Sequence, residues 1–147
     1  MEYTLRAADN NDIEFLIALR DTTLKGYLSD MGAGTDRKSY VERVLLHYDA
    51  AQIVEVNGQR AGLFKAIYRA EKNEWYVVQI QIHPDFQNGK IGSRLLKGLI
   101  EKAKLQGANV ALGVLKTNPA QNLYKRLGFK VVGENEWEYE MLLTHDQ

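Results

Sequence analysis

The sequence predicts an α/β (α+β) fold: a mixed, mostly antiparallel sheet of about seven strands, with helices on both faces and a central parallel strand pair. The first observation behind this is the order of segments, a hairpin meander followed by strand, helix, strand and helix. The second is size, because 147 residues with 45% hydrophobic content are enough to bury one core. We therefore expect a single domain over residues 1–147.

The first third of the chain predicts one strand and two helices. Alternating residues at 3–7 indicate a short strand, and Asp9–Asp12 supply helix-capping side chains. Apolar residues at helical spacing then predict a helix that ends near Lys25. Because residues 26–35 contain three glycines, we expect a loop there, followed by a second helix over residues 36–48.

The middle of the chain predicts three antiparallel strands. Segments 52–56 and 61–68 flank Asn57-Gly58, the strongest short-range signal for a two-residue hairpin turn. A turn at Asn73 leads into a third strand over residues 74–83. These segments form the meander of the predicted sheet.

The last third predicts the parallel pair and the remaining elements. An amphipathic helix begins at Lys90 and ends at Gly107, and Gly128 stops a later short helix. After the helix that ends at Gly107, we expect a strand over 110–114, a helix over 119–127 and strands over 129–134 and 136–143. We expect Trp75–His83 to pair in parallel with Ala108–Val114. Ligands lie beyond the carboxyl ends of such strands, where loops 87–92 and 116–118 should meet.

Composition excludes several kinds of site and partner. The charges of nineteen basic and nineteen acidic residues cancel. The sequence therefore predicts binding neither to nucleic acid nor to an anionic membrane surface. The chain has no cysteine, and His47, His83 and His145 are too scattered for a metal motif, so no metal is expected. No secretory leader or membrane span is recognisable, and we expect a cytoplasmic protein.

The most informative segment is Gln87-Asn-Gly-Lys-Ile-Gly92, between a predicted strand and a predicted helix. A glycine-containing loop at a helix start lets backbone N–H groups converge on an anion. The segment therefore predicts a phosphate or pyrophosphate site, and the alternative is an ordinary turn and helix cap.

Two segments together resemble the GNAT N-acetyltransferase superfamily. Residues 80–96, Ile-Gln-Ile-His-Pro-Asp-Phe-Gln-Asn-Gly-Lys-Ile-Gly-Ser-Arg-Leu-Leu, resemble its acetyl-CoA-binding core, and residues 118–129, Asn-Pro-Ala-Gln-Asn-Leu-Tyr-Lys-Arg-Leu-Gly-Phe, resemble its second motif. The resemblance covers nearly the whole chain. It implies acetyl-CoA (coenzyme A) as co-substrate, and it implies that transfer goes directly to a primary amine in a ternary complex.

The resemblance also assigns residues to the coenzyme. Those expected to bind it are Ile80, Gln81, Ile82, Gln87, Asn88, Gly89, Lys90, Ile91, Gly92, Ser93, Asn118 and Asn122. The strand residues would bind through their backbone, and each asparagine has a helix cap as its alternative role. Lys90 stands where the family has its first glycine. We expect helical dihedrals there, which would let Lys90 donate the same backbone N–H to the pyrophosphate.

For catalysis, the resemblance implies that Tyr124 donates a proton to the departing thiolate, with coverage of the core edge as its alternative role. Many members carry a glutamate base on the central strand, where this chain has Gln79 and Gln81. We predict His83 as the general base, and two glutamates (Glu55, Glu74) and a water chain are the alternatives.

The acceptor is a small-molecule or peptide amine, and the resemblance places Arg20, Tyr27 and Leu28 at its pocket. Tyr27-Leu28 would be a mobile gate or, as we favour, an anchor for the glycine-rich loop. A GNAT-fold module that binds acyl-CoA without turnover is the alternative function, and a protein that binds no nucleotide is a second one. Aromatic residues on the late strands either form a homodimer surface or pack under the helices (Trp75, Tyr76, Trp137, Tyr139).

Overall fold

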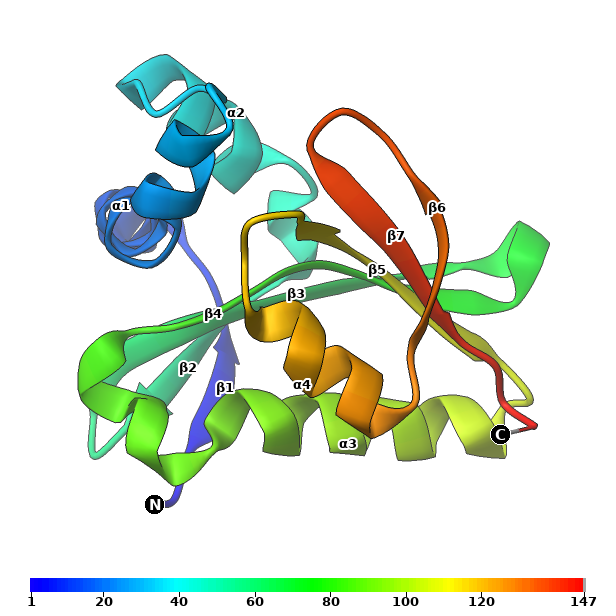
Figure 1. Cartoon of the computed structure of the whole chain (residues 1–147). Coiled ribbons are helices and arrows are strands. Elements are labelled where there is room, and N and C mark those ends of the chain that lie inside the picture. The colour runs from blue at the N-terminus through cyan, green and yellow to red at the C-terminus, as the bar shows by residue number, and fades with distance from the viewer. Residues whose placement is uncertain (147) are drawn as a thin grey trace. The chain divides into compact units, whose positions relative to one another are not determined.

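The computed structural model describes residues 1–146 (Figure 1). Its seven strands pair in the order β1-β2-β3-β4-β5-β7-β6, and β4 and β5 are parallel. The strands are β1 (Thr4–Ala7), β2 (Ala51–Val56), β3 (Gln59–Arg69), β4 (Glu74–Ile82), β5 (Asn109–Leu115), β6 (Lys130–Glu134) and β7 (Glu138–Leu143). The α-helices are α1 (Ile13–Asp30), α2 (Arg37–Leu45), α3 (Ile91–Leu105) and α4 (Ala120–Leu127). The predicted mixed sheet with a parallel pair is confirmed.

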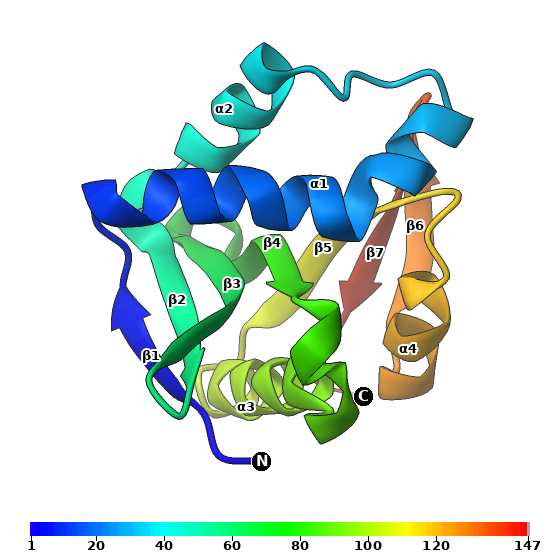
Figure 2. The same cartoon turned by 90° about the vertical axis from the view of Figure 1, so that its left-hand side faces the viewer.

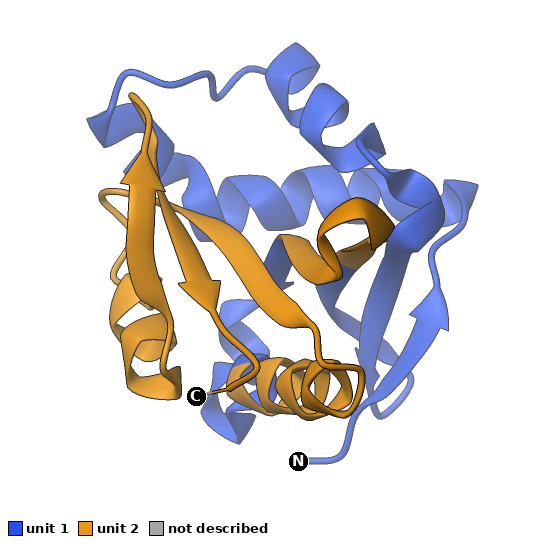
Figure 3. Cartoon of the chain, turned by 90° about the vertical axis from the view of Figure 1, so that its right-hand side faces the viewer, with its two compact units in different colours: residues 1–65, 79–92 blue, residues 66–78, 93–147 orange. Residues whose placement is uncertain are grey.

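The chain forms two compact units, which are described separately (Figure 3). Unit 1 contains residues 1–65 and 79–92, and unit 2 contains residues 66–78 and 93–147. Strands β3 and β4 contribute residues to both units.

Unit 1 packs two helices on the same side of its first three strands (Figures 1 and 2). Helix α1 buries Leu16 and Leu19, while Ile53 of β2 and Leu63 of β3 are among the fully buried residues of these strands. The hairpin turn between β2 and β3 has positive φ at both Asn57 (52°) and Gly58 (77°). Two such residues match the twist of the flanking strands, so the predicted tight turn is confirmed.

The expectation that the first helix ends near Lys25 is wrong, because α1 continues to Asp30. Gly26 costs about 1 kcal/mol inside a helix, but Leu28, two residues further, is only 4% exposed. Burying a leucine contributes about 1.5–3 kcal/mol and outweighs that cost. The helix stops where Gly32 adopts a positive φ of 73° and its N–H donates to the Ser29 carbonyl.

Helix α2 is shorter than the predicted 36–48, and both of its ends are capped. The Asp36 side chain accepts the Ser39 N–H at the first turn. At the last turn, Nζ of Lys65 donates to the carbonyls of Arg43 (3.3 Å), Val44 (2.8 Å) and Leu46 (2.5 Å). The side chain that ends this helix therefore comes from β3, about twenty residues further along the chain.

Unit 2 contains the parallel pair, in which Glu74–Val77 lie beside Asn109–Leu112. Strand β7 then pairs antiparallel with both β5 and β6. Helix α3 ends before Gly107, and α4 is capped by Gly128, as predicted; the φ values of these glycines are 63° and 108°.

Two further observations concern the possible homodimer surface at Trp75 and membrane-spanning helices. The Trp75 indole N–H donates to the Gln106 side chain, and Lys102 lies over the Trp75 ring, so this aromatic residue has contacts within unit 2. Across residues 1–146, no helix has the length and apolar character needed to cross a membrane.

Candidate functional site

The segment singled out in the sequence forms a 3-10 helix, η4 (Pro84–Gly89), that leads into α3. The Gln87 side chain folds back on it and donates to the Ile82 carbonyl at 2.9 Å. Gln87, one of the residues predicted to bind the coenzyme, thus holds the turn against the end of β4. This hydrogen bond gives Gln87 a structural role in addition to its place in the loop.

The expectation of helical dihedrals at Lys90 is wrong. Its φ of 54° and ψ of 34° are left-handed, and its N–H donates to the Gln87 carbonyl at 3.3 Å. L-residues other than glycine adopt this region at a cost, because Cβ crowds the carbonyl. The Lys90 N–H is therefore committed to the turn, and the left-handed backbone gives a physical reason for glycine at this position.

Helix α3 begins at Ile91, and its first-turn N–H groups have no partner within the helix. They include those of Ile91, Gly92 and Ser93, where the positive end of the helix dipole also lies. A Cβ added at Gly92 would lie 3.9 Å from Ile82 and 4.0 Å from Ile80, which is ordinary contact. Packing in unit 1 therefore does not require glycine at position 92, although glycine weakens a helix.

The carboxyl half of β4 carries buried amides in unit 1. Gln79 and Gln81 are each 7% exposed. Gln79 donates from Nε2 to the Arg43 carbonyl at 3.0 Å, and Nζ of Lys65 donates to the same carbonyl. Oε1 of Gln79 is buried and has no hydrogen-bond partner among residues 1–146. Neither amide can accept a proton as a carboxylate would.

The structure limits each base candidate named from the sequence. His83 caps η4, since its Nδ1 accepts the Asp85 N–H at 3.1 Å, which leaves only Nε2 for proton transfer. Glu55 is ion-paired with Arg6 at 3.0 Å. Glu74, the first residue of β4, is ion-paired with Arg69 at 3.5 Å.

In unit 2, Tyr124 lies on α4 with its ring 6.2 Å from that of Phe129, in an edge-to-face arrangement. The side chain is 8% exposed, and burial raises the pKa of its phenol to about 12. No hydrogen bond of the Tyr124 hydroxyl is found within residues 1–146. The group is therefore a neutral acid at pH 7 that has not been committed to another side chain.

The two predicted asparagines flank the start of α4. Asn118 Oδ1 accepts the Ala120 N–H at 2.9 Å, which is the cap role that the sequence left open. Asn122 lies exposed on α4.

The residues predicted to face the acceptor all lie on α1, because that helix is longer than expected. Arg20 is buried, with its guanidinium 5.9 Å from the centre of the Tyr40 ring. Leu28 is buried and Tyr27 is half-buried, so the expected loop around them is a helix. The anchor interpretation of Leu28 agrees with its burial.

Sequence reasoning missed Lys65, whose side chain is fully buried. Burial, together with the charges of Arg43 and Arg20, lowers its pKa to about 8. A lysine within a strand pattern gives no sign of burial, and only the three-dimensional approach of α2 reveals it. Residues 1–146 contain no group of three or more potential ligands placed to hold a metal ion.

Comparison with known proteins gives one family and many similar structures. The model of the acetyltransferase (GNAT) family matches residues 2–129. The PaiA N-acetyltransferase of Thermoplasma acidophilum, solved with coenzyme A, is 18% identical with a TM-score of 0.75, over 98% of this chain and 99% of that one. The ribosomal-protein-S18-alanine N-acetyltransferase of Escherichia coli is 18% identical with a TM-score of 0.66, over 97% and 94%.

The spermidine/spermine N-acetyltransferase of Vibrio cholerae is 21% identical with a TM-score of 0.64, over 99% of this chain and 96% of that one. Curated proteins give no significant sequence match. At these identities the structural likeness shows the fold alone.

Proposed function

The chain belongs to the acetyltransferase (GNAT) family, and we propose that residues 1–147 form one domain that transfers the acetyl group of acetyl-CoA to a primary amine. The amine attacks directly in a ternary complex. The observation that carries this proposal is the junction of η4 and α3, where first-turn N–H groups lie beside a glycine that packing does not require. Such a junction suits a pyrophosphate.

The coenzyme is held along this junction. The N–H groups of Ile91, Gly92 and Ser93 receive the pyrophosphate at the positive end of the helix dipole. Because the Lys90 N–H is used by the turn, the lysine contributes its exposed ammonium instead.

The pantetheine arm pairs with the backbone of Ile80–Ile82. Asn118 and Asn122 supply further hydrogen bonds to it; the Asn118 Nδ2 group is compatible with this role because the cap uses only Oδ1.

In the chemical step, the amine nitrogen forms a bond to the thioester carbon while the C–S bond breaks. The departing thiolate takes the Tyr124 proton. A pKa of about 12 keeps that proton on the phenol until the thiolate forms. The acceptor amine, with a reference pKa of ~10.4, must first lose its own proton, which costs ~4–5 kcal/mol at neutral pH. Nε2 of His83 or a water chain receives it, since both glutamate candidates are ion-paired.

Acceptor identity is proposed only as a class, a small-molecule or peptide amine, with Arg20, Tyr27 and Leu28 at the pocket wall. The similar structures include enzymes named for spermidine/spermine and for a ribosomal-protein alanine. A panel of such amines is therefore the starting set.

The direct test mixes the protein with acetyl-CoA and the amine panel and follows free thiol. Thiol release that requires both amine and protein supports acetyl transfer. Coenzyme A should also raise the melting temperature, approaching ~2.7 kcal/mol of stabilisation at 100 times its dissociation constant. Stabilisation without turnover on any amine would instead favour the acyl-CoA-binding module, an alternative motivated by Lys90 in the loop and by glutamines on β4.

Replacing Tyr124 by phenylalanine tests the acid. Tyr124→Phe should lower kcat roughly 100-fold or more, the contribution typical of general acid catalysis, and leave coenzyme A affinity nearly unchanged. Tyr68→Phe is the matched control, because its hydroxyl contacts Asn73 at the turn before β4. Equal loss of turnover in both variants, or in neither, would remove Tyr124 from this role.

A further inference from the structure

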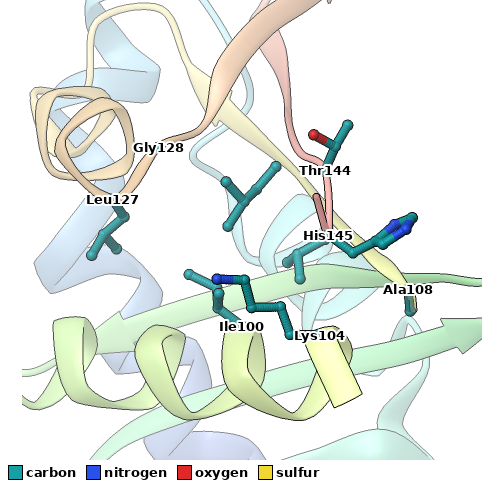
Figure 4. A pocket seen from close by; sticks show the side chains of 9 residues that line it. Ile100, Lys104, Ala108, Leu127, Gly128, Thr144 and His145 are labelled. Carbon is teal, nitrogen blue, oxygen red and sulfur yellow. The ribbon is translucent and has the colours of Figure 1, made fainter. Parts of the chain in front are cut away.

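Unit 2 contains a cavity of about 160 Å³ that the proposed acetyl transfer does not use (Figure 4). It lies between the last turns of α3 and α4 and the adjoining ends of β5 and β7. Ile100, nine residues after the start of α3, is the lining residue nearest to the η4 junction along that helix, roughly 14 Å up its axis. The cavity is therefore separate from the first turn of α3.

The cavity is lined mainly by apolar side chains, and its volume is large enough for a small ligand. Five of the nine lining residues are apolar: Ile100, Ala108, Val110, Leu127 and Leu143. An engineered cavity of about 150 Å³ with similar walls binds benzene. The volume in unit 2 thus fits an apolar body of about six carbon atoms.

The polar part of the lining favours a negative charge. Lys104, Thr144 and His145 line the cavity; no Asp or Glu among residues 1–146 does, although the Asp146 carboxylate is hydrogen-bonded to the Thr144 side chain. Within residues 1–146, Lys104 forms no ion pair, whereas His145 Nδ1 lies 3.0 Å from the Asn109 side chain. A ligand that complements the lining has an apolar body and one anionic group beside Lys104.

We propose that this cavity binds a small monocarboxylate whose apolar body has about six carbon atoms. The carboxylate pairs with Nζ of Lys104, while the apolar body lies between Leu127 and Leu143. Gly128 also lines the cavity, and its N–H and that of Phe129 donate to the Lys125 and Tyr124 carbonyls. An occupant therefore stabilises the end of the helix that carries Tyr124.

Benzoate is the probe and benzamide, of nearly the same shape but neutral, is its comparison. Isothermal titration without acetyl-CoA should give a dissociation constant for benzoate on the order of 1 mM, as expected for nine heavy atoms of modest efficiency. Benzamide should bind about 3- to 10-fold more weakly. Hydrogen exchange should slow at the Gly128 and Phe129 amides when benzoate is added.

Lys104→Gln should lower benzoate affinity about 3- to 10-fold and leave benzamide affinity unchanged. Lys102→Gln is the matched control on the same turn, since Lys102 lies over the Trp75 ring, and it should bind benzoate like the original protein. The proposal is overturned by equal affinity for the two probes, by unaltered benzoate binding in Lys104→Gln, or by no binding at ~10 mM. These outcomes do not depend on acetyl transfer.

Discussion

Replacing Lys90 with glycine should stabilise the protein, because this residue holds a left-handed backbone at the end of η4. With φ of 54° and ψ of 34°, Lys90 is one of four non-glycine residues at positive φ within residues 1–146, and the others are His47, Asn57 and Asn73. Asparagine tolerates this region better than a long side chain. Lys90 therefore carries local strain that glycine would remove.

The magnitude follows from two opposing effects. Relief of the left-handed conformation contributes about 1–2 kcal/mol. Glycine, however, gives the unfolded chain more freedom, which takes back about 0.5–1 kcal/mol. The net gain in the free energy of unfolding is therefore centred on about 0.75 kcal/mol, within limits of about 0–1.5 kcal/mol, and the central value corresponds to roughly 2–3 °C in Tm for a chain of this length.

Urea unfolding of Lys90→Gly and Lys90→Ala separates the backbone from the side chain. Alanine removes the ammonium and stem but keeps Cβ, so its stability should stay close to that of lysine. The exposed Lys90 side chain contributes little packing to confuse the comparison. If alanine stabilised the protein as much as glycine, or glycine not at all, the reasoning from dihedral strain would be refuted.

Three more predictions concern unit 1. Gly92→Val should weaken coenzyme A binding at least ~10-fold by overpacking while Gly92→Ala still folds; isothermal titration compares them, and unchanged affinity in the valine variant contradicts the loop assignment. The pKa of Lys65 is lowered from 10.5 to about 8, so the unfolded chain binds the extra proton between these pH values and the free energy of unfolding should rise there by at most about 3 kcal/mol. Urea unfolding of Lys65→Met should lack this rise, and an equal slope would be evidence against it. Arg6 lowers the pKa of Asp12 from 3.8 to about 2, so at most about 2 kcal/mol should be lost as the pH falls between these values; Asp12→Asn should flatten this part of an acid titration followed by circular dichroism.

Local chemistry made much of the fold predictable. Asn57-Gly58 fixed a two-residue turn, and the apolar spacing after Lys90 marked α3, because each pattern has a single compatible backbone. The anion site at residues 87–92 was predicted from a glycine-containing loop at a helix start, whereas its assignment to coenzyme A and the role of Tyr124 came from a resemblance. Their proposed roles still depend on the experiments above.

The predictions that were wrong or missing depend on contacts between residues far apart in the sequence or on backbone hydrogen bonds, which local sequence patterns do not describe. Gly26 resembles a helix stop, but the burial of Leu28 by distant residues extends α1 beyond it. Lys90 was expected to be helical because a helix follows, whereas its N–H is taken by the Gln87 carbonyl. Buried Lys65 and Gln79 contact α2 through its carbonyl groups, which sequence patterns do not describe.

The attachment of α2 is unequal along its length. At its last turn, the Arg43 carbonyl receives donors from two strands, Lys65 of β3 and Gln79 of β4. At its first turn, the Arg37 guanidinium meets Glu14 in an exposed ion pair, an interaction worth little in water. One turn in from that end, the buried Tyr40 side chain donates its hydroxyl to the Asp21 carboxylate of α1 at 2.9 Å. Helix α2 is therefore held to β3 and β4 at its carboxyl end and to α1 near its amino end, so changes at Lys65 and at Tyr40 would release opposite ends of the same helix.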